Sequence, residues 1–173
     1  MFLTGFMGAG KSTVGRDLAA RLERSFLDTD ELVVRADGRA IEQIFRDDGE
    51  GAFREAEERA LLEIADVADA VVATGGGLFL GAAQRRTMKR AGIVVWLDVR
   101  LEVALERVGA GDNRPLWLPD DPIRFRAWFD RRRATYALAH GRVDANGDPD
   151  AVALAAMAEL ERLGAVAPIP RDP

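Results

Sequence analysis

The stretch GFMGAGKST at residues 5–13 follows a short apolar segment and matches the G-x-x-x-x-G-K-[ST] pattern of a phosphate-binding loop. Glycines at this spacing let the backbone turn tightly, so that successive N–H groups point at phosphate oxygens. Lys11 adds a compact positive charge, and Ser12 offers a hydroxyl to a magnesium ion at the start of the helix that follows. The motif therefore predicts a site for a nucleoside triphosphate and Mg²⁺.

A glycine-rich turn before an ordinary helix is the alternative interpretation of this stretch. The composition argues against it, because the chain has 22 arginines and only two lysines, Lys11 and Lys89. One of the two stands where the motif needs a compact ammonium group. We therefore assign Lys11 to the phosphates.

Length and composition limit the class of protein. A chain of 173 residues with a net charge of -5 and 48% hydrophobic residues suits one well-cored domain, and its acidic balance disfavours nucleic acid as a partner. No apolar run approaches the ~20 residues of a membrane-spanning helix, and we expect no signal peptide. The absence of cysteine excludes disulfides and thiolate metal sites. We expect a cytoplasmic monomer that does not contact membranes.

Short apolar segments alternate with helical patterns along the chain. This alternation predicts an α/β fold of three layers, with a central parallel sheet of five strands between helices. The expected strands are 1–4, 26–27, 70–74, 93–97 and 142–145. The expected helices are 11–24, 32–36, 41–45, 51–65, 82–91, 101–108, 123–139 and 149–163.

The periodic pattern stops between residues 109 and 122, where GAGDNRPLWLPDDP is rich in glycine, proline and acidic residues. A loop of this length is typical of a mobile lid. We expect residues 1–163 to form a single domain with this lid, and residues 164–173 to form a disordered tail.

Two carboxylates, Asp28 and Asp30, follow the second expected strand, at the edge where open α/β sheets place their ligands. In an alternating strand both side chains would share a face, and near phosphates they would hold hydrated magnesium or accept a proton from a hydroxyl. The alternative is that Asp30 only caps the next helix.

Arginines and glycines add further candidates. Three consecutive glycines at 75–77 after a buried strand would let a ligand approach the backbone closely, although they would also suit a tight turn. Arg54 has glutamates at ion-pair spacing, which is typical of a solvated helix face. The run at 131–133 is likewise typical of a face with at least two of its arginines in water. Arg114 in the expected lid would reach transferring phosphates on closure.

Two other side chains have structural interpretations. We expect Trp128 to serve in core or hinge packing rather than in stacking on a base. His140, which precedes a glycine, is expected to end a helix and to interact favourably with its dipole.

Taken in order, these segments resemble the shikimate kinases, which use ATP to phosphorylate the 3-hydroxyl of shikimate in aromatic amino acid biosynthesis. The resemblance covers residues 1–163. It rests on GFMGAGKST, DTD at 28–30, the FRxxE element at 53–57, GGG at 75–77 and RPL at 114–116.

The resemblance implies a P-loop kinase fold and a role for each matching residue on the nucleotide side. Lys11, Asp30 and Arg114 would be catalytic, and Ser12 and Asp28 would hold Mg²⁺. Contacts with ATP would come from Gly8, Ala9, Gly10, Lys11, Ser12, Thr13, Arg107 and Arg114, with a loop at 146–149 near the adenine.

On the acceptor side, the resemblance implies that a helical region at about 30–60 binds shikimate. Arg54 and Arg132 would clamp its carboxylate. The remaining contacts would come from Asp30, Gly75, Gly76 and Gly77, within a pocket lined by Ile41, Phe45, Phe53, Glu57, Pro115 and Leu116.

The chain departs from the family's R-x-P-L-Y pattern, since it has RRATY at 132–136. The spacing from Tyr136 assigns the carboxylate to Arg132, with Arg133 as the competing assignment. A gluconate kinase, a catalytically idle nucleotide-binding paralogue and an ATP-dependent assembly factor are the alternative functions. The DTD, FRxxE and GGG set disfavours the first, and the presence of Lys11, Asp30 and Arg54 disfavours the second.

Overall fold

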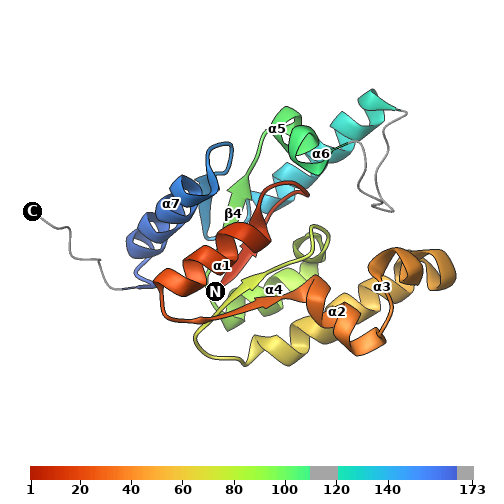
Figure 1. Cartoon of the computed structure of the whole chain (residues 1–173), viewed down its shortest axis with the longest axis horizontal. Helices are drawn as coiled ribbons and strands as arrows, with labels where there is room; N and C mark the ends of the chain where they lie inside the picture. The colour runs from red at the N-terminus through yellow and green to blue at the C-terminus, as the bar shows by residue number, and fades with distance from the viewer. Residues whose placement is uncertain (110–120, 167–173) are drawn as a thin grey trace, which may run out of the picture.

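A parallel sheet of five strands in the order β2-β3-β1-β4-β5 forms the centre of the molecule (Figure 1). The computed structural model describes residues 1–109 and 121–166. The predicted α/β architecture with its five parallel strands is confirmed. The strands are β1 (Phe2–Thr4), β2 (Ser25–Asp28), β3 (Ala70–Ala73), β4 (Val94–Asp98) and β5 (Gly141–Asp144).

Burial along the strands follows their position in the sheet. The central strands β1, β3 and β4 are buried at every residue, as expected where helices cover both faces. The edge strand β5 alternates between buried and exposed residues. The carboxyl ends of all strands lie at one edge because the sheet is parallel, and this edge carries the phosphate-binding loop.

Helices cover both faces of the sheet and produce the predicted three layers. The first and last helices pack against each other, and the third and fourth do the same (Figure 1). The helices are α1 (Lys11–Arg21), α2 (Thr29–Asp37), α3 (Ile41–Ala65), α4 (Ala82–Ala91), α5 (Leu101–Val108), α6 (Pro122–Tyr136) and α7 (Pro149–Arg162), with a short 3-10 turn, η1 (Leu78–Leu80).

Helix α3 contains a break that separates the two helices expected from the sequence. Gly49 has φ 81 and ψ 175, which is not a helical conformation. A residue with a side chain adopts such a positive φ only rarely, so this glycine is suited to the break. The segments on its two sides correspond to the expected helices 41–45 and 51–65.

Three helix boundaries differ from the predicted ones by three residues, and others differ by one. Helix α1 ends at Arg21 rather than at 24, and α2 begins at Thr29 rather than at 32. Helix α6 ends at Tyr136 rather than at 139, so His140 does not end a helix. Instead, the His140 N–H donates to the Val94 carbonyl at 2.9 Å, and its Nδ1 accepts from the Val94 N–H at 3.0 Å. Pairing with β4 overrides the helical pattern here.

Two predicted segments fall on parts of the chain that are not described. Most of the expected lid at 109–122, with Arg114, Pro115 and Leu116, lies outside the described residues, as do residues 167–173 of the expected tail. Within residues 1–109 and 121–166, no helix combines the length and the apolarity required to cross a bilayer.

Candidate active site

The phosphate-binding loop connects β1 to α1 with a backbone that depends on glycine. Gly8 and Gly10 have φ of 73 and 82, in the left-handed region. A Cβ on Gly8 would also lie 2.6 Å from the Ala104 carbonyl oxygen of α5. Among the described residues, no side chain caps the N-terminus of α1 at Gly10. The N–H groups of its first turn are therefore available to an anion.

Lys11 and Ser12 are the first two residues of α1, directly after this loop. Lys11 Nζ donates to the carbonyl oxygens of Gly5 and Phe6 at 3.1 and 3.0 Å, which holds the ammonium group beside the loop. Ser12 Oγ donates to Asp28 Oδ2 at 2.6 Å. The structure thus brings together the two residues that the sequence assigns to magnesium.

Asp28, rather than Asp30, caps the helix that follows β2. Its Oδ1 accepts the Asp30 N–H at 3.0 Å, so the alternative that Asp30 is the cap is wrong. The strand-alternation argument for the pair is also wrong, because the chain becomes helical at Thr29. A capping turn nevertheless places both carboxylates at the carboxyl edge of the sheet, where both line one cavity.

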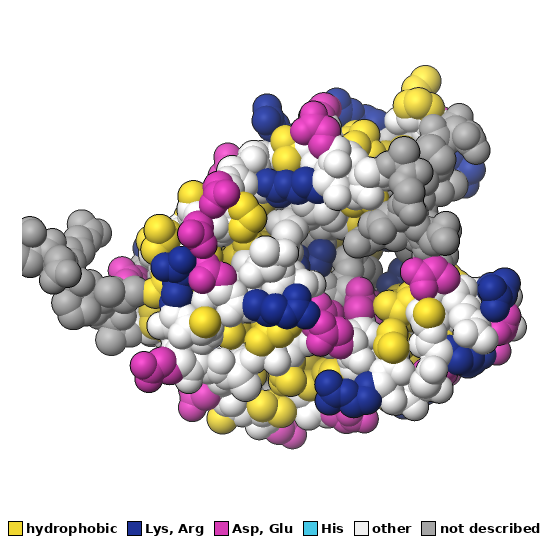
Figure 2. Space-filling model, in the orientation of Figure 1, with side chains coloured by type: hydrophobic (Ala, Val, Ile, Leu, Met, Phe, Trp, Pro, Cys, Tyr) yellow, Lys and Arg dark blue, Asp and Glu magenta, His cyan; other side chains and the backbone are white. Residues whose placement is uncertain are grey.

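A first cavity of about 500 Å³ lies over the phosphate-binding loop. Figure 2 shows the surface hollowed between the body of the molecule and the lobe of α2 and α3. Arg107 braces one wall, since it donates to the carbonyl oxygens of Gly8 at 3.3 Å and of Ala145 and Gly147 at 2.8 Å. The lining residues include Gly8, Ala9, Gly10, Lys11, Ser12, Thr13, Asp28, Asp30, Arg107, Gly147 and Pro149.

A second cavity of about 280 Å³ adjoins the first. Lys11 and Asp30 line both cavities, so the two spaces meet at these side chains. The second cavity is lined by Met7, Lys11, Asp30, Ile41, Glu42, Phe45, Phe53, Arg54, Glu57, Gly75, Gly76, Gly77 and Arg132. Every described residue that the sequence assigned to the acceptor pocket is therefore present.

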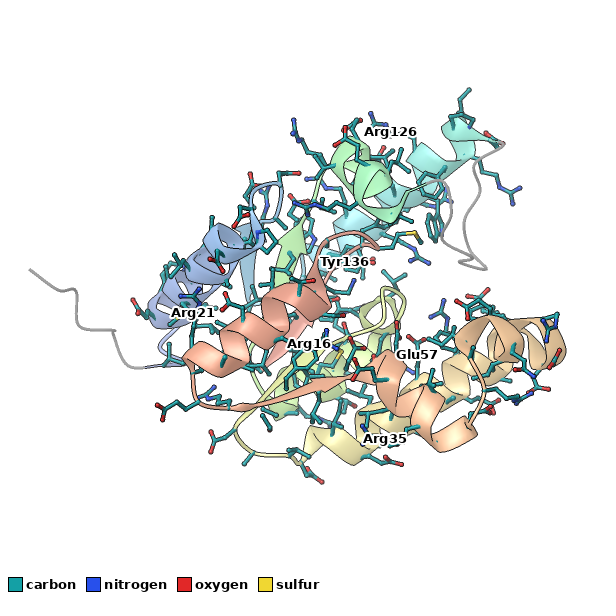
Figure 3. All side chains as sticks on the ribbon, viewed as in Figure 1. Arg16, Arg21, Arg35, Glu57, Arg126 and Tyr136 are labelled. Atoms are coloured by element: carbon teal, nitrogen blue, oxygen red, sulfur yellow. The ribbon has the colours of Figure 1, made fainter. Side chains whose placement is uncertain are left out.

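Arg54 lies between two glutamates on α3, at the wall of the second cavity. Its guanidinium is 2.9 Å from Glu50 and 2.5 Å from Glu57. It lines the cavity, so the interpretation of a purely solvated helix face is wrong. Glu57, on the inner side of α3 (Figure 3), is almost fully buried. Burial raises the pKa of Glu57 to about 7, against the opposing pull of Arg54.

The arginine run at 131–133 divides among three environments. Arg131 is exposed, whereas Arg132 is buried and lines the second cavity. Arg133 turns away and pairs with Asp98 at 2.7 Å. Since 40% of the Arg133 side chain is exposed, two of the three arginines reach water as expected, and Arg132 is the exception. Between the two competing assignments, helix α6 brings Arg132 rather than Arg133 to the cavity.

Arg132 is a buried cation with few partners. Its Nη1 lies 3.5 Å from the Gly76 carbonyl oxygen, and its Nε has no hydrogen-bond partner among the described residues. Burial lowers the pKa of Arg132. A buried guanidinium in this state is suited to an incoming anion.

The triple glycine after β3 forms the floor of the second cavity. A Cβ on Gly75 would collide with the carboxylates of Glu57 and Asp30, and one on Gly77 would collide with the Arg54 guanidinium. Close approach of charged side chains, rather than the turn, therefore explains these two glycines.

Side chains that the sequence analysis did not assign to the site hold the glycine floor in place. Thr29 Oγ1 accepts the Gly75 N–H at 2.8 Å, and the Tyr136 hydroxyl donates to the Gly76 carbonyl at 2.5 Å. Tyr136 lies near the centre of the molecule (Figure 3), and burial raises its pKa to about 12, so it remains a donor. The sequence contained one signal for it, the spacing from Arg132. Thr29 lies within the DTD motif at 28–30, but the sequence analysis gave a role only to the two aspartates of that motif.

The chain is similar to known proteins of one family. The family model described as shikimate kinase matches residues 7–161. A curated shikimate kinase of Moorella thermoacetica is 44% identical over 145 residues, which is 84% of each chain. The structure of shikimate kinase from Acinetobacter baumannii in complex with shikimate matches with a TM-score of 0.85 and 38% identity, covering 94% of this chain and 92% of that one. The crystal structure from Aquifex aeolicus gives a TM-score of 0.83 and 35% identity, over 94% and 96%.

Proposed function

The chain belongs to the shikimate kinase family, and from this premise we propose that it transfers the γ-phosphoryl group of ATP to the 3-hydroxyl of shikimate. The products are ADP and shikimate 3-phosphate, in the pathway to chorismate and the aromatic amino acids. The first cavity would hold MgATP and the second would hold shikimate.

The nucleotide half of the proposal rests on the loop and the helix that it opens. The N–H groups of residues 8–13 and the dipole of α1 suit the phosphates, and Lys11 would neutralise charge that develops during transfer. Arg107, held by the carbonyl oxygens of Ala145 and Gly147, would support the adenine side. Arg114, which lies outside the described residues, remains a predicted phosphate contact from the lid.

The residues present fit a magnesium ion. Mg²⁺ in phosphate sites takes one or two protein oxygens and completes its shell with water and phosphate oxygens. Ser12 Oγ and Asp28 Oδ2, 2.6 Å apart at the edge of the first cavity, supply such oxygens. When bound, the ion would neutralise the β- and γ-phosphates.

The acceptor half rests on charge. Arg54 and Arg132 would bind the shikimate carboxylate, and Arg132 is the buried cation in need of an anion. Asp30 would bind the hydroxyls and orient the attacking oxygen. A loose phosphoryl-transfer transition state needs little help from a base, so we assign Asp30 chiefly to positioning and then to accepting the proton.

The observation that carries the proposal is that Lys11 and Asp30 line both cavities. The Lys11 ammonium group, assigned to the phosphates, and the Asp30 carboxylate, assigned to the acceptor hydroxyls, thus lie together where a γ-phosphate would face a hydroxyl. The test is coupled ADP release by the purified protein with MgATP and shikimate, gluconate, quinate or no acceptor. We expect turnover that depends on shikimate. ATP binding without stimulation by any acceptor would leave only a nucleotide-binding protein, and turnover with gluconate alone would assign it to a different substrate.

Three expectations from the sequence are retained as predictions. They are the single domain over residues 1–163, the monomeric state and the cytoplasmic location. Size-exclusion chromatography with light scattering would test the second of them.

A further inference from the structure

Trp128 supports the buried guanidinium of Arg132. The Arg132 Cζ lies 3.7 Å from the centroid of the Trp128 ring, which is the geometry of a cation–π contact. The two residues are four apart on α6, so they lie on the same face of that helix. Trp128 is half-buried, and of the two residues it is Arg132 that lines the second cavity.

This contact matters because Arg132 has little other compensation. Among the described residues it makes no ion pair, whereas Arg54 has two glutamates and Arg133 has Asp98. An aromatic face attracts a cation without forming a hydrogen bond, so it stabilises the charge and leaves the N–H groups for a ligand. A carboxylate in the place of Trp128 would instead compete with the substrate.

Trp128 also contacts the phosphate-binding loop. Trp128 packs against Phe6 with ring centroids 5.2 Å apart and an interplanar angle of 73°. The Phe6 carbonyl in turn accepts from Lys11 Nζ at 3.0 Å. Trp128 is therefore packed against the same loop that holds Lys11, and also against Phe125 of its own helix at 5.4 Å.

We propose that Trp128 is a positioning residue that stabilises the buried positive charge of Arg132 and orients its guanidinium for the carboxylate of the acceptor. This inference rests on the proposed function, because it takes the anionic acceptor as the ligand of Arg132. It goes further by assigning part of the selectivity for a carboxylate to an aromatic side chain that does not itself bind the acceptor.

A double-mutant cycle tests this role. The proteins are the wild type, Trp128→Leu, Arg132→Met and the double variant, each assayed for KM and kcat with shikimate and for KM with ATP. We expect Trp128→Leu to raise KM for shikimate by about 2- to 30-fold, the range of a partly to fully desolvated cation–π contact. Its kcat and its KM for ATP should change little. In the Arg132→Met background, Trp128→Leu should have no further effect.

Two matched variants separate this role from simple packing. Trp128→Phe retains an aromatic face and should restore most of the affinity for shikimate. Phe129→Leu removes another ring that packs against Phe6, at 4.9 Å, but the guanidinium beside Phe129 is that of Arg133. Phe129→Leu should lower the melting temperature without raising KM for shikimate.

The outcomes separate failure of this inference from failure of the proposed function. Equal losses from Trp128→Leu in both backgrounds, with a normal wild type, would mean that Trp128 only packs, and the inference would be overturned. The same conclusion follows if Trp128→Leu raises the KM values for ATP and shikimate equally. A wild-type protein that neither binds nor phosphorylates shikimate would overturn the proposed function itself.

Discussion

Glu57 Oε2 lies 2.5 Å from Arg54 Nη1 in an ion pair. The side chain of Glu57 is only 1% exposed, whereas the side chain of Arg54 is 30% exposed. The second oxygen of Glu57, Oε1, has no hydrogen-bond partner among the described residues and lies beside Gly75. A buried carboxylate with one unsatisfied oxygen favours its protonated form. The acceptor pocket therefore contains a group that titrates near neutral pH.

The first prediction concerns this titration. The unfolded chain releases the Glu57 proton near pKa 4.5, whereas the folded protein retains it up to about 7. Between these values the folded state binds more protons, so the contribution of Glu57 to stability falls as pH rises. Glu57→Gln keeps the shape and removes the titration. Melting temperatures measured across this range should decline less steeply with pH in the variant, and an unchanged slope would contradict the raised pKa.

Lys11→Met should abolish most turnover and leave the fold intact. Lys11 donates to the loop carbonyls of Gly5 and Phe6, and it begins α1, where methionine is a good helix former. Loss of a cation that stabilises transition-state charge is expected to lower kcat by about 100- to 1,000-fold. The control is Lys89→Met on the exposed surface of α4, which should retain wild-type kcat. Near-normal turnover in Lys11→Met would contradict the assignment of the first cavity.

Arg132 and Arg133 provide a matched pair for the acceptor site. Arg132→Met should raise KM for shikimate by about 10- to 150-fold, because a charge-assisted hydrogen bond contributes ~1.5 to 3 kcal/mol. Arg133→Met should leave KM unchanged and lower the melting temperature, since it removes one partner of the buried Asp98. Steady-state kinetics and thermal unfolding of both variants test which arginine binds the carboxylate. The reverse pattern would assign the carboxylate to Arg133.

Two glycines should respond in opposite ways to the same substitution. Gly75→Ala would force a Cβ into the carboxylates of Glu57 and Asp30, so we expect a large loss of kcat/KM. Gly51→Ala, inside α3 with no atom within 4 Å of the added Cβ, should stabilise the protein by about 0.5 to 1 kcal/mol. Denaturant unfolding and kinetics on both proteins test this contrast. An active Gly75→Ala enzyme would show that the carboxylates can move aside.

The order of the elements was predictable because each has a strong local signal. Buried strands such as β3 are continuous apolar runs that end at glycine, and the loop before α1 has a motif with a defined backbone shape. The cap of α7 at Asp148 was predictable for the same reason.

The environment of individual side chains was less predictable, because it depends on packing between distant segments. Three adjacent arginines on α6 point in directions about 100° apart, and only docking of the helix decides which one faces the cavity. Ion-pair spacing from Arg54 does not distinguish Glu57 from Glu58, but in the structure Glu57 is the buried one that faces the glycine floor. The spacing of four between Trp128 and Arg132 indicates that they share a helix face. It does not show that an aromatic ring, rather than a carboxylate, lies beside the buried guanidinium.

The last prediction concerns His140, whose titration opposes that of Glu57. Burial, with a smaller contribution from Lys89, lowers the pKa of His140 below 6.5. The unfolded chain therefore binds the proton more readily, and stability is lost as pH falls below about 6.5. Protonation would also convert Nδ1 from an acceptor into a donor facing the Val94 N–H, its partner at 3.0 Å. His140→Asn should remove this loss on acidification. Its melting temperature, measured from neutral pH downward, should therefore fall less than that of the wild type. A variant that loses stability on acidification as steeply as the wild type would show that His140 is not the responsible group.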